Sequence, residues 1–322
     1  MKKRLTLLSI AMIFALALGS ISAYAADHKL GLMLYGEADE ATISIRTGFE
    51  KACEENGVDL EVYSIEQDYS KCPTYLQMFF DSGCDMIVDA TWSADAGLLT
   101  EATCKEEGIP LFTCDVEYSD YAHLVGANSY EAGRTNGQYI TDWVNEHWDG
   151  EVNYILCLYP VFTGEGVKQR LTGAVEVLGE NGLWDKGEDG CEWFDSRSTE
   201  EAYKYVTDWL QGNPDATHVF IIGNNDSMGL GQYNAVEQME RQDDCIVSSF
   251  NCDSFALEHF AATEEGDPWL ASCNFNLSGY GDLAVPALIE IVESGEDNIE
   301  HELTTQTFMV DRSNVAEFLS AE

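Results

Sequence analysis

Apolar and polar positions alternate in blocks along most of this chain, and the blocks predict strands and helices in turn. The first apolar block, 29–35, is uninterrupted, as expected of a strand buried on both faces, and the block 41–56 has the spacing of a helix that ends at Gly57. Later blocks repeat this order. Further strands are predicted at 58–65, 85–90, 110–114 and 123–125, and helices at 74–80 and 94–107.

A second series of the same kind begins after a predicted helix at 131–147. Uninterrupted apolar strands joined by helices are typical of parallel sheets that helices cover on both faces. Two such series predict an α/β fold made of two doubly wound, Rossmann-like lobes. The second series has predicted strands at 152–158, 191–194, 217–222, 245–250 and 269–273, and helices near Val167, Glu200, Met228 and Phe255.

The N-terminus has the pattern of an export signal. Met1 is followed by three basic residues, 5–18 is almost entirely apolar, and Ala23-Tyr24-Ala25 has the small side chains of a signal-peptidase site. The apolar stretch is shorter than a stable membrane span requires. We therefore expect residues 1–25 to be a signal peptide, cleaved near Ala25, and the mature protein to be periplasmic.

Acidic residues dominate the charge of the chain. The 58 Asp and Glu residues outnumber the 16 Lys and Arg residues, and the formal net charge is -42. Such a field repels nucleic acids and anionic membrane surfaces, so neither is expected as a partner. A solvated acidic coat explains the charge most simply, and a cationic ligand is the sharper alternative.

Ten cysteines are unusual for an exported bacterial protein of this size unless some of them pair. Their spacing leaves the connectivity open. Cys84, Cys114, Cys157 and Cys273 fall in or beside predicted strands, where free cysteines act as small core residues. No Cys-x-x-Cys or His-x-x-x-His motif is present, so neither a metal site nor a cofactor is predicted.

Polar or aromatic side chains follow many of the predicted strands in both series. Ligands of open parallel sheets bind beyond the carboxyl ends of the strands, so these positions are candidates for a binding site. Asp and Asn are also common turn formers and helix caps, so their recurrence at strand ends indicates more than any single residue does. The candidates are Asp39, Trp92, Asp115, Asn128, Asn225, Asn251 and Asn274.

Four segments together resemble one known family. The most specific is 223–231, which reads Gly-Asn-Asn-Asp-Ser-Met-Gly-Leu-Gly; the others are 30–57 with Thr47-Gly48-Phe49, 108–111 leading to Asp115, and 126–128 followed by 131–134. With these segments the chain resembles the type I periplasmic binding proteins, the ribose and galactose receptors of sugar ABC importers. The resemblance covers nearly the whole mature chain.

The resemblance implies two lobes that are joined by three crossings and close on a ligand between them. The crossings would lie near Asn128, Asn274 and Thr304. The first lobe would comprise 26–128 and 275–303, and the second lobe 129–274 and 304–322.

The resemblance also implies which residues contact the ligand. Asp115 and Asn225 match an Asp and an amide of the family, and Tyr35 and Asp39 lie in its first ligand-contacting loop. Other positions depart from the family pattern. Among the polar positions, Lys168 stands where Arg is frequent, with Arg170 as an alternative, Asn251 replaces Asp, Asn274 or Asn276 replaces Gln, and Val116 replaces Arg.

The aromatic positions also differ. Ala41 and Thr42 replace the aromatic residues that stack on the ligand, and Arg197 lies near a position that is often aromatic. The flat face of Trp92 could replace the missing aromatic residues.

The function that the resemblance implies is that of an extracytoplasmic solute-binding protein of an ABC importer. It would bind a small neutral sugar or polyol and dock, as a monomer, on a membrane permease; modified sugars and small signalling ligands stay open. A sensor that presents its closed form to a membrane receptor or kinase is the alternative. An enzyme is not expected, because 31–36 is followed by Glu37 rather than the Lys-Ser/Thr of a phosphate loop, and no Gly-x-Ser-x-Gly elbow is present.

Overall fold

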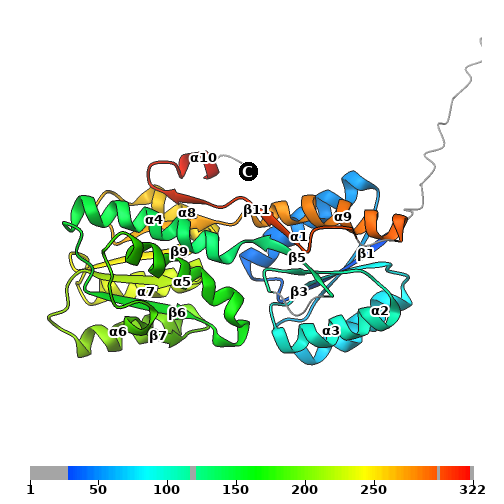
Figure 1. Cartoon of the computed structure of the whole chain (residues 1–322), viewed down its shortest axis with the longest axis horizontal. Coiled ribbons are helices and arrows are strands. Elements are labelled where there is room, and N and C mark those ends of the chain that lie inside the picture. The colour runs from blue at the N-terminus through cyan, green and yellow to red at the C-terminus, as the bar shows by residue number, and fades with distance from the viewer. Residues whose placement is uncertain (1–27, 117–120, 296–297, 320–322) are drawn as a thin grey trace, which may run out of the picture.

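Two six-stranded sheets organise the protein, one in each of two lobes that lie side by side (Figure 1). This computed structural model describes residues 28–116, 121–295 and 298–319, so the predicted export signal lies outside the described residues. The first sheet has the strand order β2-β1-β3-β4-β5-β11, and all of its paired strands are parallel. Its strands are β1 (Lys29–Leu34), β2 (Asp59–Ser64), β3 (Met86–Ala90), β4 (Leu111–Cys114), β5 (His123–Ala127) and β11 (Glu302–Thr305).

The second sheet repeats the same winding with the order β7-β6-β8-β9-β10-β12. Only its last strand is antiparallel to its neighbour. Its strands are β6 (Tyr154–Tyr159), β7 (Glu192–Asp195), β8 (Val219–Gly223), β9 (Cys245–Phe250), β10 (Trp269–Asn274) and β12 (Phe308–Asp311). The predicted fold class, two doubly wound α/β lobes, is confirmed. The two strands β11 and β12 were not predicted.

Helices cover the sheets, and their starts are fixed by local sequence. Side chains of Asp39, Ser93, Asn128, Ser198 and Asn225 each accept a hydrogen bond from the first turn of the helix that follows, which satisfies an otherwise unpaired backbone N–H. The helices are α1 (Glu40–Asn56), α2 (Cys72–Asp81), α3 (Ala94–Glu107), α4 (Ser129–His147), α5 (Glu165–Glu180), α6 (Thr199–Gly212), α7 (Asp226–Gln238), α8 (Ser254–Ala262), α9 (Tyr280–Ser294) and α10 (Ala316–Leu319).

The chain passes between the two sheets three times. It leaves the first sheet after β5, returns after β10 so that α9 packs against α1, and passes from β11 in the first sheet to β12 in the second (Figure 1). The helices α1 and α9 approach closely because Gly48 and Gly281 have no side chains: a Cβ at Gly281 would lie 2.4 Å from the carbonyl oxygen of Gly48. A Cβ at Gly48 would lie 2.1 Å from the carbonyl oxygen of Ser278, just before α9. The lobe boundaries at 128, 274 and 304 stay predictions.

The cysteines are mostly buried core residues, and none of them forms a disulfide within the described residues. All ten lie within the described residues, all ten are free, and nine of them are buried. Cys84, Cys114, Cys157 and Cys273 are core residues, as the strand pattern predicted. Burial raises the pKa of the Cys53 thiol to about 12, so the thiol stays protonated and behaves as a small apolar group. The structure therefore favours the core interpretation of these cysteines over pairing.

Candidate ligand-binding site

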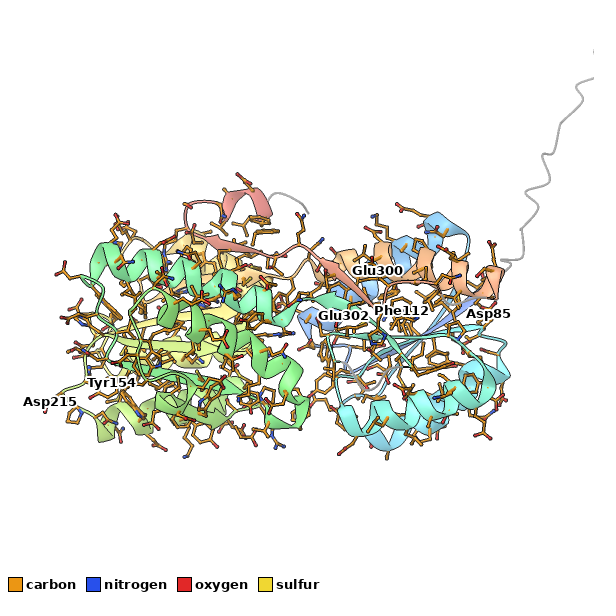
Figure 2. The ribbon with its side chains drawn as sticks, viewed as in Figure 1. Asp85, Phe112, Tyr154, Asp215, Glu300 and Glu302 are labelled. Atoms are coloured by element: carbon orange, nitrogen blue, oxygen red, sulfur yellow. The ribbon has the colours of Figure 1, made fainter. Side chains whose placement is uncertain are left out.

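The carboxyl ends of both sheets point toward the junction of the lobes. In Figure 2, Asp85, just before β3, lies at the outer end of the first lobe, whereas Phe112 of β4 lies inside that lobe. Tyr154, the first residue of β6, lies at the outer end of the second lobe. The strands therefore run inward from both sides. Loops that follow them face the opposite lobe, which is where open parallel sheets bind ligands.

A buried pair of opposite charges lies at this junction. Asp115 follows β4 in the first lobe and Arg170 lies on α5 in the second, and a guanidinium nitrogen is 3.9 Å from the Asp115 Oδ1. Both residues are buried, with exposed fractions of 8% and 6%. Burial raises the pKa of the Asp115 carboxyl, while the Arg170 charge and a hydrogen bond from Tyr280 oppose that rise. Desolvation outweighs the attraction, so a further hydrogen-bond donor to this carboxyl would stabilise its charged form.

Neighbouring groups fix the position of Arg170. Its guanidinium donates to the backbone carbonyl of Asn224 at 3.2 Å and to the Ser129 hydroxyl at 3.4 Å. It also lies over the ring of Phe275, 4.3 Å from the ring centroid. Ser129 begins α4 and Phe275 follows β10, so Arg170 contacts two of the three segments that join the sheets.

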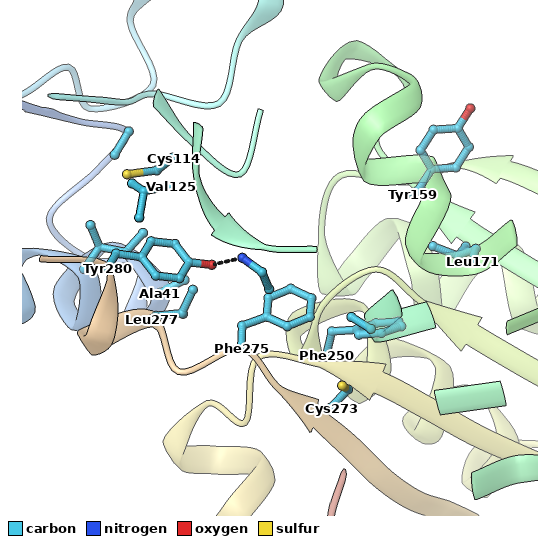
Figure 3. Close-up of a cluster of buried hydrophobic side chains, with 14 of the residues drawn as sticks. Ala41, Cys114, Val125, Tyr159, Leu171, Phe250, Cys273, Phe275, Leu277 and Tyr280 are labelled. Carbon is cyan, nitrogen blue, oxygen red and sulfur yellow. Dashed lines mark hydrogen bonds between the residues drawn. The ribbon is translucent and has the colours of Figure 1, made fainter. Parts of the chain in front are cut away.

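Tyr280 of the first lobe also binds the Asp115 carboxylate. This residue begins α9, and its hydroxyl donates to the Asp115 Oδ1 at 2.7 Å and accepts from the backbone N–H of Ala127 at 3.1 Å, the bond dashed in Figure 3. Figure 3 also shows Phe250 and Phe275 beside this junction, with ring centroids 5.6 Å apart. One hydrophobic core is therefore continuous from lobe to lobe beneath the charged pair.

Aromatic side chains gather at the carboxyl ends of β1 and β3. Tyr35 and Trp92 have ring centroids 5.5 Å apart, and Tyr69 lies 6.4 Å from Tyr35. The Trp92 Nε1 is buried and has no hydrogen-bond partner among the described residues. Burial and then Asp39 raise the pKa of Tyr35, and Arg197 of the second lobe opposes the rise.

Three candidates serve as helix caps. Asp39, Asn128 and Asn225 accept backbone hydrogen bonds of 3.0 Å at the starts of α1, α4 and α7. The two asparagines use only the amide oxygen for this purpose. Their NH2 groups can still donate to a ligand hydroxyl.

The remaining candidates have other partners. Lys168 forms an ion pair of 3.0 Å with Glu188, so Arg170 is the cation that the structure brings to the junction. Arg197 is exposed and pairs with Asp195 at 3.0 Å. Asn274 accepts from the backbone N–H of Asn276 at 2.6 Å, and Asn251 has a positive φ of 108°.

The structure adds residues that sequence reasoning missed. Tyr280 is one, and the pair Glu40 and Ser254 is another: the backbone N–H and the hydroxyl of Ser254 donate to the Glu40 carboxylate at 2.6 and 2.7 Å. A second carboxyl, Asp226, is buried and accepts from the Ser249 hydroxyl at 2.6 Å. Asp226 falls inside the segment 223–231 and could have been selected there. Nothing in the local sequence of Tyr280, Glu40 or Ser254 distinguishes them.

The junction offers what a hydroxylated ligand needs. Carboxylate and amide oxygens accept hydrogen bonds, a guanidinium and amide groups donate them, and Tyr35 and Trp92 present flat apolar surfaces. Among the described residues no group of three His, Cys, Asp or Glu could hold a metal ion. Two grooves of about 440 and 250 Å³ lie along α1 instead, and none of the candidate residues lines them. No helix in the described part of the chain is long and apolar enough to cross a membrane.

Comparisons with known proteins agree with this architecture. A crystal structure of an ABC transporter solute-binding protein from Mycobacterium smegmatis with bound glycerol superimposes with a TM-score of 0.75 at 18% identity, over 92% of this chain and 98% of that chain. A solute-binding protein from Bacillus halodurans with bound myo-inositol gives 0.74 at 17% identity, over 92% and 99%. At this identity, these matches establish the fold.

The sequence comparisons cover nearly the same length. A protein of Rhizobium meliloti described as a rhizopine-binding protein is 22% identical over 305 residues, 92% of this chain and 94% of the relative. The model of the family described as "Periplasmic binding protein domain" matches residues 30–297. The resemblance drawn from the sequence is thereby confirmed, and the chain belongs to the periplasmic binding proteins, a family of solute-binding proteins rather than enzymes.

Proposed function

We propose that this protein binds a small, uncharged, polyhydroxylated solute, a polyol or sugar, between its two lobes and delivers it to a membrane ABC permease. The observation that carries the proposal is the buried junction of Asp115, Arg170 and Tyr280, to which both lobes contribute. A solute that bridges the lobes there would supply the hydrogen bonds that closing removes from water.

The solute class follows from the groups at the junction and from the relatives. Asp115 and Arg170 already neutralise each other, so a ligand with several hydroxyls suits them better than a charged one. The similar solved structures include proteins with bound glycerol, myo-inositol or D-allose. Tyr35 and Trp92 supply the flat faces against which the C–H surface of such a solute packs.

Sensing is a second candidate function. The fructose-binding periplasmic domain of a hybrid two-component system has the same fold, with a TM-score of 0.72 at 20% identity. Deleting the gene distinguishes the two roles. Loss of uptake of the labelled solute supports import, whereas retained uptake with loss of the transcriptional response to the solute supports sensing.

A thermal-shift screen of polyols and sugars tests the binding proposal, with isothermal titration calorimetry of every hit. A ligand at 100 times its Kd stabilises the folded protein by about 2.7 kcal/mol, which raises the melting temperature by several degrees. Asn225→Ala should weaken binding about tenfold, because it leaves a buried hydroxyl without its partner. Asn181→Ala, which removes an amide at the outer end of α5, is the matched control and should bind normally. A screen without any hit, or unchanged affinity in Asn225→Ala, contradicts the proposal.

A further inference from the structure

A contact between the lobes lies apart from the buried junction. Glu40 is the first residue of α1 in the first lobe, and Ser254 is the first residue of α8 in the second. The Ser254 backbone N–H donates to the Glu40 Oε2 at 2.6 Å, and its hydroxyl donates to the Oε1 at 2.7 Å. Both carboxylate oxygens are therefore used by the opposite lobe.

Helix α8 needs the Glu40 carboxylate because the residue at its own N-cap does not accept a hydrogen bond from it. Asp253 stands at the N-cap of α8, but its side chain accepts no hydrogen bond from the helix. The first N–H groups of a helix have no partner within the helix and attract negative charge. Glu40 of the other lobe supplies both the acceptor and the charge, so α8 is capped from across the lobes.

Neighbouring carboxyl groups make the contact dependent on closure. Asp39 lies beside Glu40, and Asp226 accepts from the Asp253 backbone N–H at 2.7 Å. Burial, together with Asp226, Asp39 and Glu40, raises the pKa of the Asp253 carboxyl well above its usual range. Asp253 therefore binds a proton more readily in the closed protein than in water, which lessens its repulsion of Glu40. Separation of the lobes would return both groups to water.

We propose that Glu40 is a latch: by capping α8 of the second lobe it holds the lobes together around the ligand and slows ligand release. The inference rests on the proposed function, since it assumes that the lobes close on a solute. Glu40 acts here as a positioning residue for closure. The hydrogen bonds to the ligand are assigned to the buried junction.

Release kinetics test the latch with whichever polyol or sugar the thermal-shift screen identifies. Glu40→Ala should raise koff about fivefold and leave kon within twofold, because the contact slows the separation of closed lobes and plays no part in the first encounter with a ligand. Ser254→Ala should have a smaller effect in the same direction, and the double variant should release the ligand no faster than Glu40→Ala alone. Glu54→Ala, which removes an exposed glutamate near the other end of α1, is the matched control and should behave as wild type.

Hydrogen exchange tests the same contact without a ligand. Amide protons at the start of α8 should exchange several times faster in Glu40→Ala than in wild type or Glu54→Ala. Faster exchange in a protein that binds no compound of the screen upholds the latch while the proposed function fails. Normal ligand binding with unchanged exchange and unchanged koff in Glu40→Ala overturns the latch and leaves the proposed function intact. If Glu40→Ala exchanges like wild type and the protein binds no compound of the screen, both the latch and the proposed function are overturned.

Discussion

The buried charge pair at the junction makes a quantitative prediction about coupling between the lobes. Arg170→Met removes the guanidinium but keeps an apolar side chain of similar reach over Phe275. Asp115→Asn removes the carboxylate charge but keeps an oxygen that accepts from Tyr280. The double variant contains neither charge.

The distances set the expected magnitudes. Two unit charges 3.9 Å apart attract by about 4 kcal/mol at an effective dielectric constant of 20, and much of this is offset by desolvation. Arg170→Met also loses two hydrogen bonds of about 1 kcal/mol each and leaves Asp115 buried without a cation. We expect it to lower the free energy of unfolding by about 3 kcal/mol and Asp115→Asn to lower it by about 1 kcal/mol. The double variant should lose about 2 kcal/mol less than the sum of the two.

Urea unfolding at pH 7.5, followed by tryptophan fluorescence, measures all four proteins. As the pH is lowered from 7.5, the deficit of Arg170→Met should shrink, because burial raises the pKa of Asp115 and the unpaired carboxyl takes up a proton more readily in the folded state than in the unfolded state. Two results together would refute the reasoning that Asp115 and Arg170 stabilise each other across the lobes. One is that the losses of stability in the two single variants add to that of the double variant within 0.5 kcal/mol, and the other is that the Arg170→Met deficit does not depend on pH.

Two further predictions concern the rest of the structure. Burial raises the pKa of Asp226 to about 7, above its unfolded value near 3.9, so the folded state holds a proton that the unfolded state releases. The free energy of unfolding should therefore fall by up to about 1.4 kcal/mol per pH unit as the pH rises from 5 to 7. Asp226→Asn should reduce this slope in urea titrations at several pH values, and the neighbouring Asp253, whose pKa is also raised, should retain part of it. Gly48→Ala should destabilise the protein by at least about 2 kcal/mol in the same assay, because its Cβ would meet the Ser278 carbonyl, whereas Gly212→Ala, with open space around it, should be neutral or stabilising.

Most of the fold could be predicted because each lobe repeats one local pattern. Strands covered on both faces are buried along nearly their whole length and mostly apolar, so β1, β3, β8 and β9 stand out in the sequence. The edge strands β11 and β12 carry no such pattern, since only one of their residues is fully buried. Backbone hydrogen bonds to β5 and β10 hold these two strands in place, and such pairing cannot be predicted from their side chains.

The site could be predicted only in part. Strand order places Asp115, Trp92 and Asn225 at the carboxyl ends of strands, and sequence alone identifies those ends. Whether a cation at Lys168 or at Arg170 reaches the other lobe depends on how α5 is turned, and the structure selects Arg170. Sequence reasoning left open whether the cysteines pair, and in the structure all ten, which lie within the described residues, are free.

The sequence by itself determined the succession of strands and helices, the caps that start the helices and the polar strand ends, because each depends on residues within one or two turns. Only the tertiary structure decided which distant groups meet. Tyr280 contacts Asp115 across 165 positions of sequence, and Ser254 contacts Glu40 across 214. Such contacts follow from the packing of whole lobes, which no local periodicity encodes.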